Sequence, residues 1–450
     1  MLHAAVLPLP WREPLAAAAS FADEPWTLLL LSGGGGSHAR WSYLLRRPTR
    51  TLMLGPGDDR PPVAALTDLL GPMSASAADG SPFGGGLAGL ASYELGERLD
   101  PTGLGSDPDW PDLAVGLYPT VLAFDHALGR VLAIGRAAAS ACAEAAAARA
   151  ATWLQHDAPP SGPPSTEVSP LRAEPPEAYE AAVANVTGRI AAGEIFQANI
   201  ARRWTGRLAR GVQPFDVVRR LAAESAAPFT AYLRLPGRAL VSNSPERFLG
   251  VAPAQGALVA ETRPIKGTRP RSADPAEDAR LAAELLASAK DRAENLMIVD
   301  LMRNDLSRVC VPGAVETPEL FRLESFANVH HLVSTVRGRL APGRTALDLF
   351  GAAFPPGSVT GAPKLQAMRV IARHEPPRGP YCGALFWAGV DGAFDSSVLI
   401  RTAAFVEDEG GWRVEARAGA GITADSDPVA ERLETEAKIA ALRHALEGGG

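Results

Sequence analysis

A proline-rich stretch divides the chain into two unequal parts. Residues 157–170 read DAPPSGPPSTEVSP, and proline both fixes φ and lacks the backbone N–H that helices and sheets need. The residues just before it, 137–154, read AAASACAEAAAARAATWL, a composition typical of a helix. We therefore predict a helix followed by a linker or long loop at 157–170. It joins an N-terminal, strand-rich region, 1–156, to a catalytic region, 171–446.

Apolar runs bounded by turn residues predict strands on both sides of this linker. Residues 120–137 read as two short strands, and 396–407 and 411–421 are further strand candidates. Helices are expected to begin after Asp274 and Asp427, because each is followed by proline, and aspartate caps a helix whose first residue proline tolerates. No periodic repeat occurs, which argues against a solenoid. We expect a mixed α+β fold built around antiparallel sheet, with both regions sharing one core.

Charge and cysteine content exclude several classes of protein. The formal net charge is −6 and no long basic run is present, so a nucleic-acid partner is not expected. Cys142, Cys310 and Cys382 lie far apart without a CxxC pair, which argues against a zinc site and a disulfide framework. The first residues lack a signal-peptide pattern, and WTLLLL is too short to span a bilayer. We expect a cytoplasmic protein without a membrane segment.

Lys266 stands in the unusual context ETRPIKGTRPR, residues 261–271. Pro264 biases Arg263 toward an extended backbone, and Gly267 allows a tight turn directly after the lysine. Lys266 is thus expected at a strand end, aimed by a stiff backbone. Taken alone, a solvated turn lysine explains the tripeptide KGT equally well.

Acidic residues recur three positions apart on two expected helices. Asp291 and Glu294 form one pair, and Glu431 and Glu434 form the other. At this spacing both carboxylates project from one helix face, where like charges repel mildly. Two such pairs could converge on Mg²⁺, which prefers oxygen ligands. Acidic pairs on exposed helix faces are the alternative that spacing leaves open.

The motifs as a set resemble those of the chorismate-utilising enzymes, which include component I of anthranilate synthase and of aminodeoxychorismate synthase, and the isochorismate and salicylate synthases. The strong motifs cover about Glu194 to Leu442, and the weaker motif GGGLAGLASYELG extends the resemblance toward the N-terminus. The resemblance implies an α+β fold of two packed antiparallel sheets flanked by helices. The motifs in chain order are GGGLAGLASYELG, TRPIKGTRPR, DRAENLMIVDLMRNDLSRV, FANVHHLVSTVRG, PPGSVTGAPKLQAM, SSVLIRTA, GAGITADSDP and ERLETEAKIAAL.

Two positions indicate the branch of the family. PIKGT with Lys266 is typical of the aminodeoxychorismate synthases, whereas the other branches usually carry a small residue there. Gln197, in GEIFQANI, stands where the isochorismate and salicylate synthases have the lysine that activates water. The resemblance thus implies amination of chorismate at C4 to 4-amino-4-deoxychorismate, on the route to 4-aminobenzoate and folate. Anthranilate synthase component I is the alternative, and a catalytically silent chorismate-binding subunit is a third possibility.

The same resemblance assigns the chemical roles. It implies that Lys266 attacks C2 of chorismate to form a covalent adduct, which requires a neutral amine. Glu246, in NSPERFLG, corresponds to the acid that protonates the departing C4 hydroxyl, which requires a raised pKa. Glu294 and Glu434 match the family's principal magnesium ligands, with Glu431 beside them. Asp291 stands where some relatives have glutamate.

Further residues match positions that hold the substrate. The expected substrate-binding residues are Gln197, Thr268, His331, Ser358, Thr360, Tyr381, Arg401, Gly419, Ala420 and Gly421. Arg401 and Tyr381 match the residues that hold the enolpyruvyl carboxylate, a task suited to a forked guanidinium. A packed core histidine is the alternative reading of His331, and a strand-end turn is the alternative for residues 419–421.

Three features depart from the family pattern, in regulation, in nitrogen supply and in the segment after CGA. The tryptophan-feedback motif of anthranilate synthases is not recognisable near the N-terminus, so tight regulation by tryptophan is not expected. No glutaminase cysteine motif is present either, so ammonia is expected from solution or from a separate glutamine amidotransferase subunit. The family often has Gly-Tyr after CGA, where this chain has Phe386 and Trp387.

Overall fold

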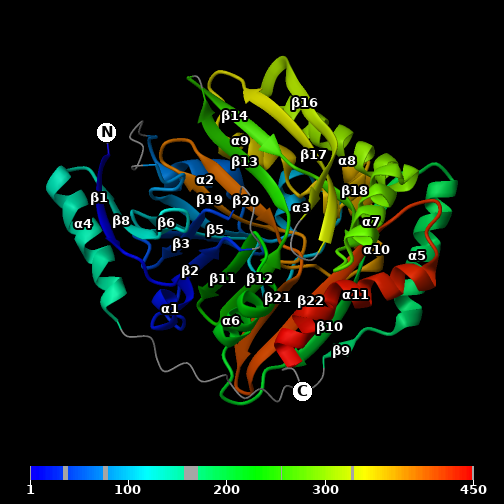
Figure 1. Cartoon of the computed structure of the whole chain (residues 1–450), viewed down its shortest axis with the longest axis horizontal. Helices are drawn as coiled ribbons and strands as arrows, with labels where there is room; N and C mark the ends of the chain where they lie inside the picture. Colours follow the sequence, from blue (N-terminus) through cyan, green and yellow to red (C-terminus); the bar gives the residue numbers. More distant parts are fainter. Residues whose placement is uncertain are drawn as a thin grey trace.

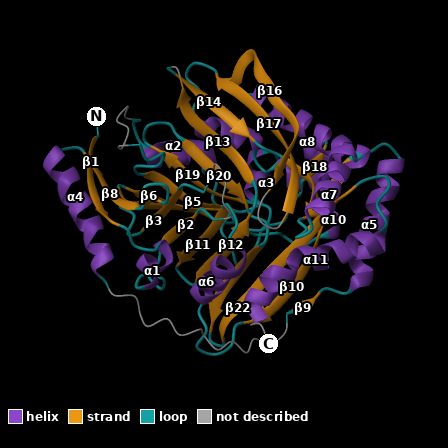
Figure 2. Ribbon diagram, viewed as in Figure 1, coloured by secondary structure: helices purple, strands orange, loops and turns teal. Residues whose placement is uncertain are grey.

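The computed structural model describes residues 2–33, 39–73, 80–156, 171–254, 256–325 and 329–447. The expected linker at 157–170 lies outside these residues. Two antiparallel sheets form the centre and helices surround them (Figures 1 and 2). The α+β fold expected from the sequence is confirmed. None of the described helices combines the length and apolarity needed to cross a membrane.

The first sheet contains twelve strands. Its continuous order is β1 (His3–Pro10), β8 (Arg130–Ala137), β7 (Thr120–Asp125), β3 (Trp41–Leu45), β2 (Leu28–Leu31), β11 (Phe229–Leu235), β12 (Arg238–Ser244), β21 (Thr402–Asp408), β22 (Gly411–Ile422), β10 (Gln197–Arg207) and β18 (Gly361–Ala362), with β9 (Arg172–Ala173) paired to β10. Strands from both ends of the sequence are therefore neighbours in one sheet.

The second sheet contains ten strands and also combines strands from distant parts of the sequence. Its order is β15 (Ile265–Pro270), β17 (Val329–Leu340), β14 (Ala257–Thr262), β13 (Arg247–Ala254), β20 (Phe394–Val398), β19 (Ala384–Gly389), β5 (Gly86–Ala91), β6 (Leu113–Tyr118) and β4 (Arg50–Leu54), with β16 (Cys310–Ser325) paired to β17.

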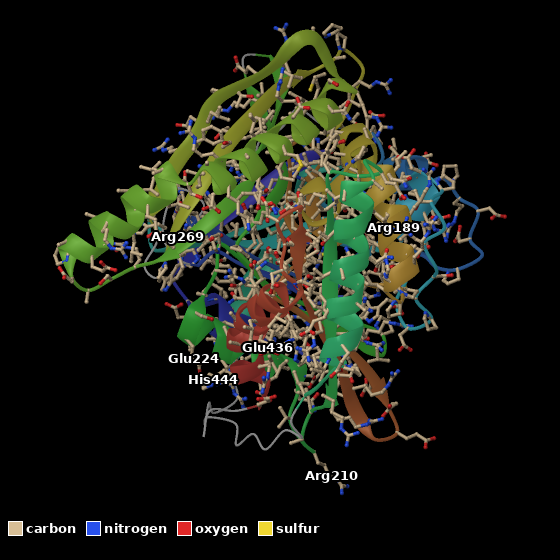
Figure 3. All side chains as sticks on the ribbon, turned by 90° about the vertical axis from the view of Figure 1, so that its right-hand side faces the viewer. Arg189, Arg210, Glu224, Arg269, Glu436 and His444 are labelled. Atoms are coloured by element: carbon tan, nitrogen blue, oxygen red, sulfur yellow. The ribbon has the colours of Figure 1, made fainter. Side chains whose placement is uncertain are left out.

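Helices cover the outer faces of the sheets. They are α1 (Pro14–Ala19), α2 (Pro62–Leu70), α3 (Leu95–Leu99), α4 (Ser140–Thr152), α5 (Pro176–Ala191), α6 (Pro214–Ser225), α7 (Pro275–Ala287), α8 (Ala289–Ser307), α9 (Ala346–Ala353), α10 (Lys364–His374) and α11 (Pro428–Glu447), with 3₁₀ turns at Trp153–Gln155 and Gly357–Val359. Figure 3 shows charged side chains such as Arg189 of α5 and Glu436 of α11 on this outer layer.

The expected helix starts are confirmed, and the capping atoms explain them. Asp274 accepts a hydrogen bond from the Ala276 amide, which satisfies one of the free N–H groups of the first turn of α7. Ser288 ends α7 and its side chain accepts from the Asp291 amide, so the next helix, α8, begins at once. Asp427 caps α11 in the same manner, through the Ala430 amide.

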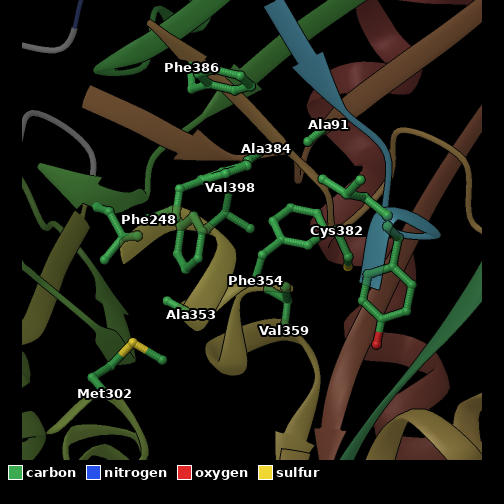
Figure 4. Close-up of a cluster of buried hydrophobic side chains, with 14 of the residues drawn as sticks. Ala91, Phe248, Met302, Ala353, Phe354, Val359, Cys382, Ala384, Phe386 and Val398 are labelled. Carbon is green, nitrogen blue, oxygen red and sulfur yellow. The ribbon is translucent and has the colours of Figure 1, made fainter. Parts of the chain in front are cut away.

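Three buried clusters make up the core. One lies between the sheets, where Tyr43 and Leu233 of the first sheet meet Leu90 and Leu385 of the second. Another packs the second sheet against α8, α9 and α10, and its aromatic centre is drawn in Figure 4 around Phe248. The third packs the first sheet against its outer helices. Burial of these side chains provides the main driving force for folding.

The strand expected at 396–407 is divided into two. β20 ends at Val398 in the second sheet, and β21 starts at Thr402 in the first. Arg401 lies between them with a φ of 52°, a left-handed backbone that is uncommon for a non-glycine residue. The turn at Arg401 therefore carries the chain from one sheet to the other.

Candidate active site

The candidate site lies where the two sheets join. Two of the points at which the chain crosses between the sheets lie here: one between β12 and β13, at Glu246, and one between β20 and β21, at Arg401. The crossings are adjacent because β12 pairs with β21 and β13 pairs with β20. The Val398 amide donates to the Glu246 carbonyl at 3.0 Å, and the Asn243 amide donates to the Arg401 carbonyl at the same distance. This arrangement fixes the backbones of both residues.

Lys266 is the second residue of β15, at the end of the second sheet. The pairing of β15 with β17 is irregular between Ile265 and Thr268, and such irregularities redirect side chains. Gly267 has a φ of 83°, and a Cβ there would come within 2.8 Å of the Leu285 side chain. Only glycine permits both this turn and the close approach of α7. The predicted strand-end lysine is confirmed, and its side chain is half-buried.

Ser358 links Lys266 to Glu246. Lys266 Nζ donates to the Ser358 carbonyl at 3.4 Å, and the Ser358 hydroxyl donates to Glu246 Oε1 at 2.5 Å. Desolvation lowers the pKa of Lys266, against the opposing effect of the Glu246, Glu294 and Glu434 carboxylates. Desolvation raises the pKa of Glu246, although the Ser358 hydrogen bond and the cations of Lys266 and Arg401 oppose the rise. Each shift is toward the uncharged form of its group.

His331 adjoins the same strand end. Its Nδ1 lies 2.9 Å from the Thr268 hydroxyl, and only 6% of the residue is exposed. Desolvation and the nearby Arg401 cation lower the pKa of His331 to about 4. The imidazole is therefore neutral at physiological pH and can exchange hydrogen bonds without adding charge.

The paired strands β10 and β22 form a wall, in which Gly419 and Gly421 of β22 lie next to the amide side chains of β10. A Cβ on Gly421 would lie 1.8 Å from Gln197 Nε2, and one on Gly419 would lie 2.7 Å from Asn199 Oδ1. Both glycines are therefore required by the amide side chains opposite. Gln197 Oε1 and Asn199 Oδ1 are buried, and neither has a hydrogen-bond partner within the described residues, so both can accept from a bound donor. Ala420 packs its methyl group into the core instead.

Part of β22 is an open sheet edge. The neighbouring strand β21 pairs with β22 only as far as Ala416. Beyond that point the Gly419 carbonyl accepts from Lys438 at 2.9 Å. Because the N–H and C=O of one strand residue point to the same side, the Gly419 amide faces this edge too. A backbone amide beside a lysine suits a carboxylate.

The remaining expected substrate-binding residues differ in their solvent exposure. Arg401 is exposed, whereas Tyr381 is only 7% exposed and its hydroxyl would lie 3.1 Å from a Cβ on Gly419. Thr360 is fully buried: its hydroxyl donates to the Pro356 carbonyl and accepts from Tyr93. Thr360 thus supports the Ser358 turn from behind.

The acidic residues face Lys266 from two helices. Glu294 lies on α8, and Glu431 and Glu434 lie on α11. Desolvation raises the pKa of Glu294, with repulsion from Asp291 and Glu431 adding to the rise. Although desolvation opposes it, an ion pair with Lys438 at 2.6 Å lowers the pKa of Glu434.

These side chains supply the carboxylate oxygens that a hard cation prefers, and a cation would relieve the repulsion of Glu294 by Asp291 and Glu431. Within the described ranges, no three potential ligands already converge as a metal cage. Glu431 accepts from the Ser426 hydroxyl at 2.7 Å. Asp291 instead forms an ion pair with Arg269 at 3.3 Å, against β15.

A separate cavity of about 780 Å³ opens between the sheets. Its lining includes Tyr43, Phe229, Trp387 and the ion pair between Arg247 and Asp395. None of the candidate site residues lines it.

Residues 31–444 match the family described as chorismate binding enzyme. The chain belongs to this family. It is 39% identical to aminodeoxychorismate synthase component 1 of Klebsiella aerogenes, over 99% of this chain and all of that protein. It is 40% identical to anthranilate synthase component 1 of Streptomyces coelicolor, over 96% of this chain and 86% of that protein. The crystal structure of anthranilate synthase component I from Streptococcus pneumoniae superposes with a TM-score of 0.76 at 28% identity, covering 91% of this chain and 93% of that one.

In this chorismate binding enzyme, Ser358 lies between Lys266 and Glu246, and Glu294 of α8 and Glu434 of α11 lie near enough to act on the pKa of Lys266. Sequence reasoning missed Lys438, which contacts both Glu434 and Gly419. Its position four residues after Glu434 places both side chains on one helix face. That spacing was the available signal.

Proposed function

We propose that this chorismate binding enzyme replaces the C4 hydroxyl of chorismate with an amino group. The observation that carries the proposal is the pairing of Lys266, whose pKa burial lowers, with Glu246, whose pKa burial raises, through Ser358. A nucleophilic amine must be neutral and a general acid must be protonated. The name of the Klebsiella relative, aminodeoxychorismate synthase component 1, supports the same reaction.

In the first half of the proposed reaction, Lys266 Nζ bonds to C2 of the ring. The two ring double bonds shift toward C4, and the C4–O bond breaks. Glu246 gives its proton to the departing hydroxyl, which leaves as water. The Lys266 adduct is then a secondary ammonium, and Glu246 is a carboxylate.

In the second half, ammonia attacks C4 and the double bonds return. The bond between C2 and Lys266 breaks, and the lysine leaves as the neutral amine. The new amino group gives its extra proton to Glu246, which restores the starting state. Each group on the protein thus ends the cycle as it began, and the net change is chorismate plus ammonia to the 4-amino product plus water.

The wall formed by β10 and β22 would hold the substrate. The Gly419 amide, Lys438 and Arg401 suit the carboxylates of chorismate, and the side-chain oxygens of Gln197 and Asn199 can accept from a bound donor. Glu294, Glu431 and Glu434 would hold Mg²⁺, which would offset the negative charge of a substrate carboxylate. The relatives are named as component 1 proteins, which supports a separate glutamine amidotransferase subunit as the source of ammonia.

Anthranilate synthesis is the second candidate, because the Streptomyces relative carries that name at similar identity. The products separate the two reactions. Chorismate, Mg²⁺ and ammonium are incubated with the protein and the products are separated by chromatography. We expect the 4-amino product, which needs a further lyase to become 4-aminobenzoate. Anthranilate as the main product would overturn the proposal.

The covalent step has its own test. With chorismate and Mg²⁺ but no ammonia, intact mass spectrometry should show a substrate-derived mass on Lys266, and Lys266→Ala should abolish it. Formation of the 4-amino product without any adduct would retain the reaction and reject covalent catalysis.

A further inference from the structure

A buried guanidinium lies behind the substrate wall. Arg378 follows α10, and 1% of its side chain is exposed. Its Nε donates to Glu375 Oε2 at 3.0 Å and its Nη2 donates to Glu375 Oε1 at 2.8 Å. This two-point geometry is available to arginine but not to lysine. Glu375 in turn accepts from the Ala201 amide of β10 at 2.8 Å.

The same guanidinium reaches two segments that carry candidate site residues. Nη2 donates to the Asn199 carbonyl at 2.7 Å, on β10. Nη1 donates to the Val359 carbonyl at 3.3 Å, inside the turn that carries Ser358. One rigid planar group therefore sets the spacing between the amide side chains of β10 and the serine that links Lys266 to Glu246.

Two tyrosines extend this arrangement. The Arg378 guanidinium lies 4.7 Å from the ring centroid of Tyr93 and 5.9 Å from that of Tyr381, within the range of cation–π attraction. The Tyr93 hydroxyl donates to Thr360 Oγ1 at 3.2 Å. Tyr381 itself borders Gly419. Arg378 thus contacts three segments of the candidate site: strand β10, the turn that carries Ser358, and Tyr381.

We propose that Arg378 is a positioning residue for chorismate, acting through these three segments without touching the substrate. The proposal rests on the proposed use of this site for chorismate. Arg417 offers a matched comparison, because it is equally buried and belongs to the same charge cluster. Arg417 donates to the Pro376 and Pro377 carbonyls and to Glu415, and its Nη1 lies 3.8 Å from Glu375 Oε2. Unlike that of Arg378, its side chain donates no hydrogen bond to β10 or to the turn that carries Ser358 among the described residues.

The test compares Arg378→Lys with Arg417→Lys in chorismate saturation curves at fixed, saturating ammonium. Arg378→Lys should raise KM for chorismate about tenfold with kcat changed less than about threefold, because small misplacements of binding groups weaken uniform binding. Arg417→Lys should leave KM within about twofold of the parent. Melting temperatures are measured for both variants. A fall in melting temperature for both with an unchanged KM would assign Arg378 a purely structural role and overturn the proposal.

A second variant covers failure of Arg378→Lys to fold. Tyr93→Phe removes only the hydroxyl that contacts Thr360, and it should also raise KM for chorismate. An unchanged KM in that variant would overturn the proposal. The rate is followed as chorismate consumption, so KM is obtained whichever product forms, and failure of the proposed amination appears separately in the product analysis. If the parent protein does not consume chorismate, calorimetric Kd values for chorismate replace KM.

Discussion

Replacement of Glu246 by glutamine tests the acid at the centre of the proposed reaction. Glutamine keeps the size of the side chain and an oxygen that can accept the Ser358 hydrogen bond of 2.5 Å, but it has no proton to give. Loss of a general acid costs about 10²- to 10⁴-fold in rate, or ~3–5 kcal/mol in the barrier. Glutamine also removes a desolvated ionisable group, so we expect stability to change by no more than about 1 kcal/mol. A change of that size shifts the melting temperature by about 2–4 °C.

The pH profile gives a sharper criterion than the rate. Burial lowers the pKa of Lys266, and the neutral amine increases as pH rises through that value. Burial raises the pKa of Glu246, and its protonated form disappears as pH rises. The two groups titrate as a coupled pair, so kcat/KM of the parent should be bell-shaped. In Glu246→Gln only Lys266 remains, and the residual rate should rise with pH to a plateau.

The assay is steady-state turnover of chorismate with saturating ammonia, in buffers from about pH 5 to pH 10. The control is Glu144→Gln on α4, which lies at the left edge of the molecule in Figure 1, away from α11, and should behave as the parent does. A bell-shaped profile retained in Glu246→Gln, even at reduced rate, would refute the assignment of the acid.

Three further outcomes are expected. Glu294→Gln and Glu434→Gln should abolish activity with the fold retained by circular dichroism, and full activity of the parent in excess chelator would contradict a role for Mg²⁺. Gly421→Ala should lower stability by ~1–3 kcal/mol, the range for overpacking, and raise KM for chorismate, because its Cβ would lie 1.8 Å from Gln197 Nε2. Gly188→Ala on α5, with open space around it, should instead stabilise by up to ~1 kcal/mol in denaturant titrations. Ammonium alone should support turnover, whereas turnover with glutamine by the isolated chain would exclude a separate glutaminase.

Local signals predicted local structure well. The alanine-rich stretch forms α4, and Asp274 caps α7, because caps and helix propensity act within a few residues. The turn at Lys266 followed from its proline and glycine neighbours. The division of 396–407 at Arg401 could not be read from the sequence, because an apolar run does not say which sheet each half joins.

The sequence pattern does not predict contacts between distant segments of the chain, for the same reason. The family motifs assigned Glu246, Lys266 and Ser358 to one site, but the hydrogen bond between Glu246 and Ser358 depends on three-dimensional packing. Arg378 stands in no recognised motif, and its partners Asn199 and Val359 lie on other segments of the chain. The role of Arg378 follows from its burial and its contacts in the structure, not from its residue type.

The interleaving of the two sheets has a consequence for synthesis of the protein on the ribosome. β2 needs β11, and β5 needs β19, to complete their hydrogen bonds. A chain emerging N-terminus first therefore exposes unpaired strand edges until much of the remaining sequence has been translated. Such edges invite aggregation. Slower elongation would lengthen this exposure, and newly made chains should depend on chaperones more than a protein whose strands pair with near neighbours.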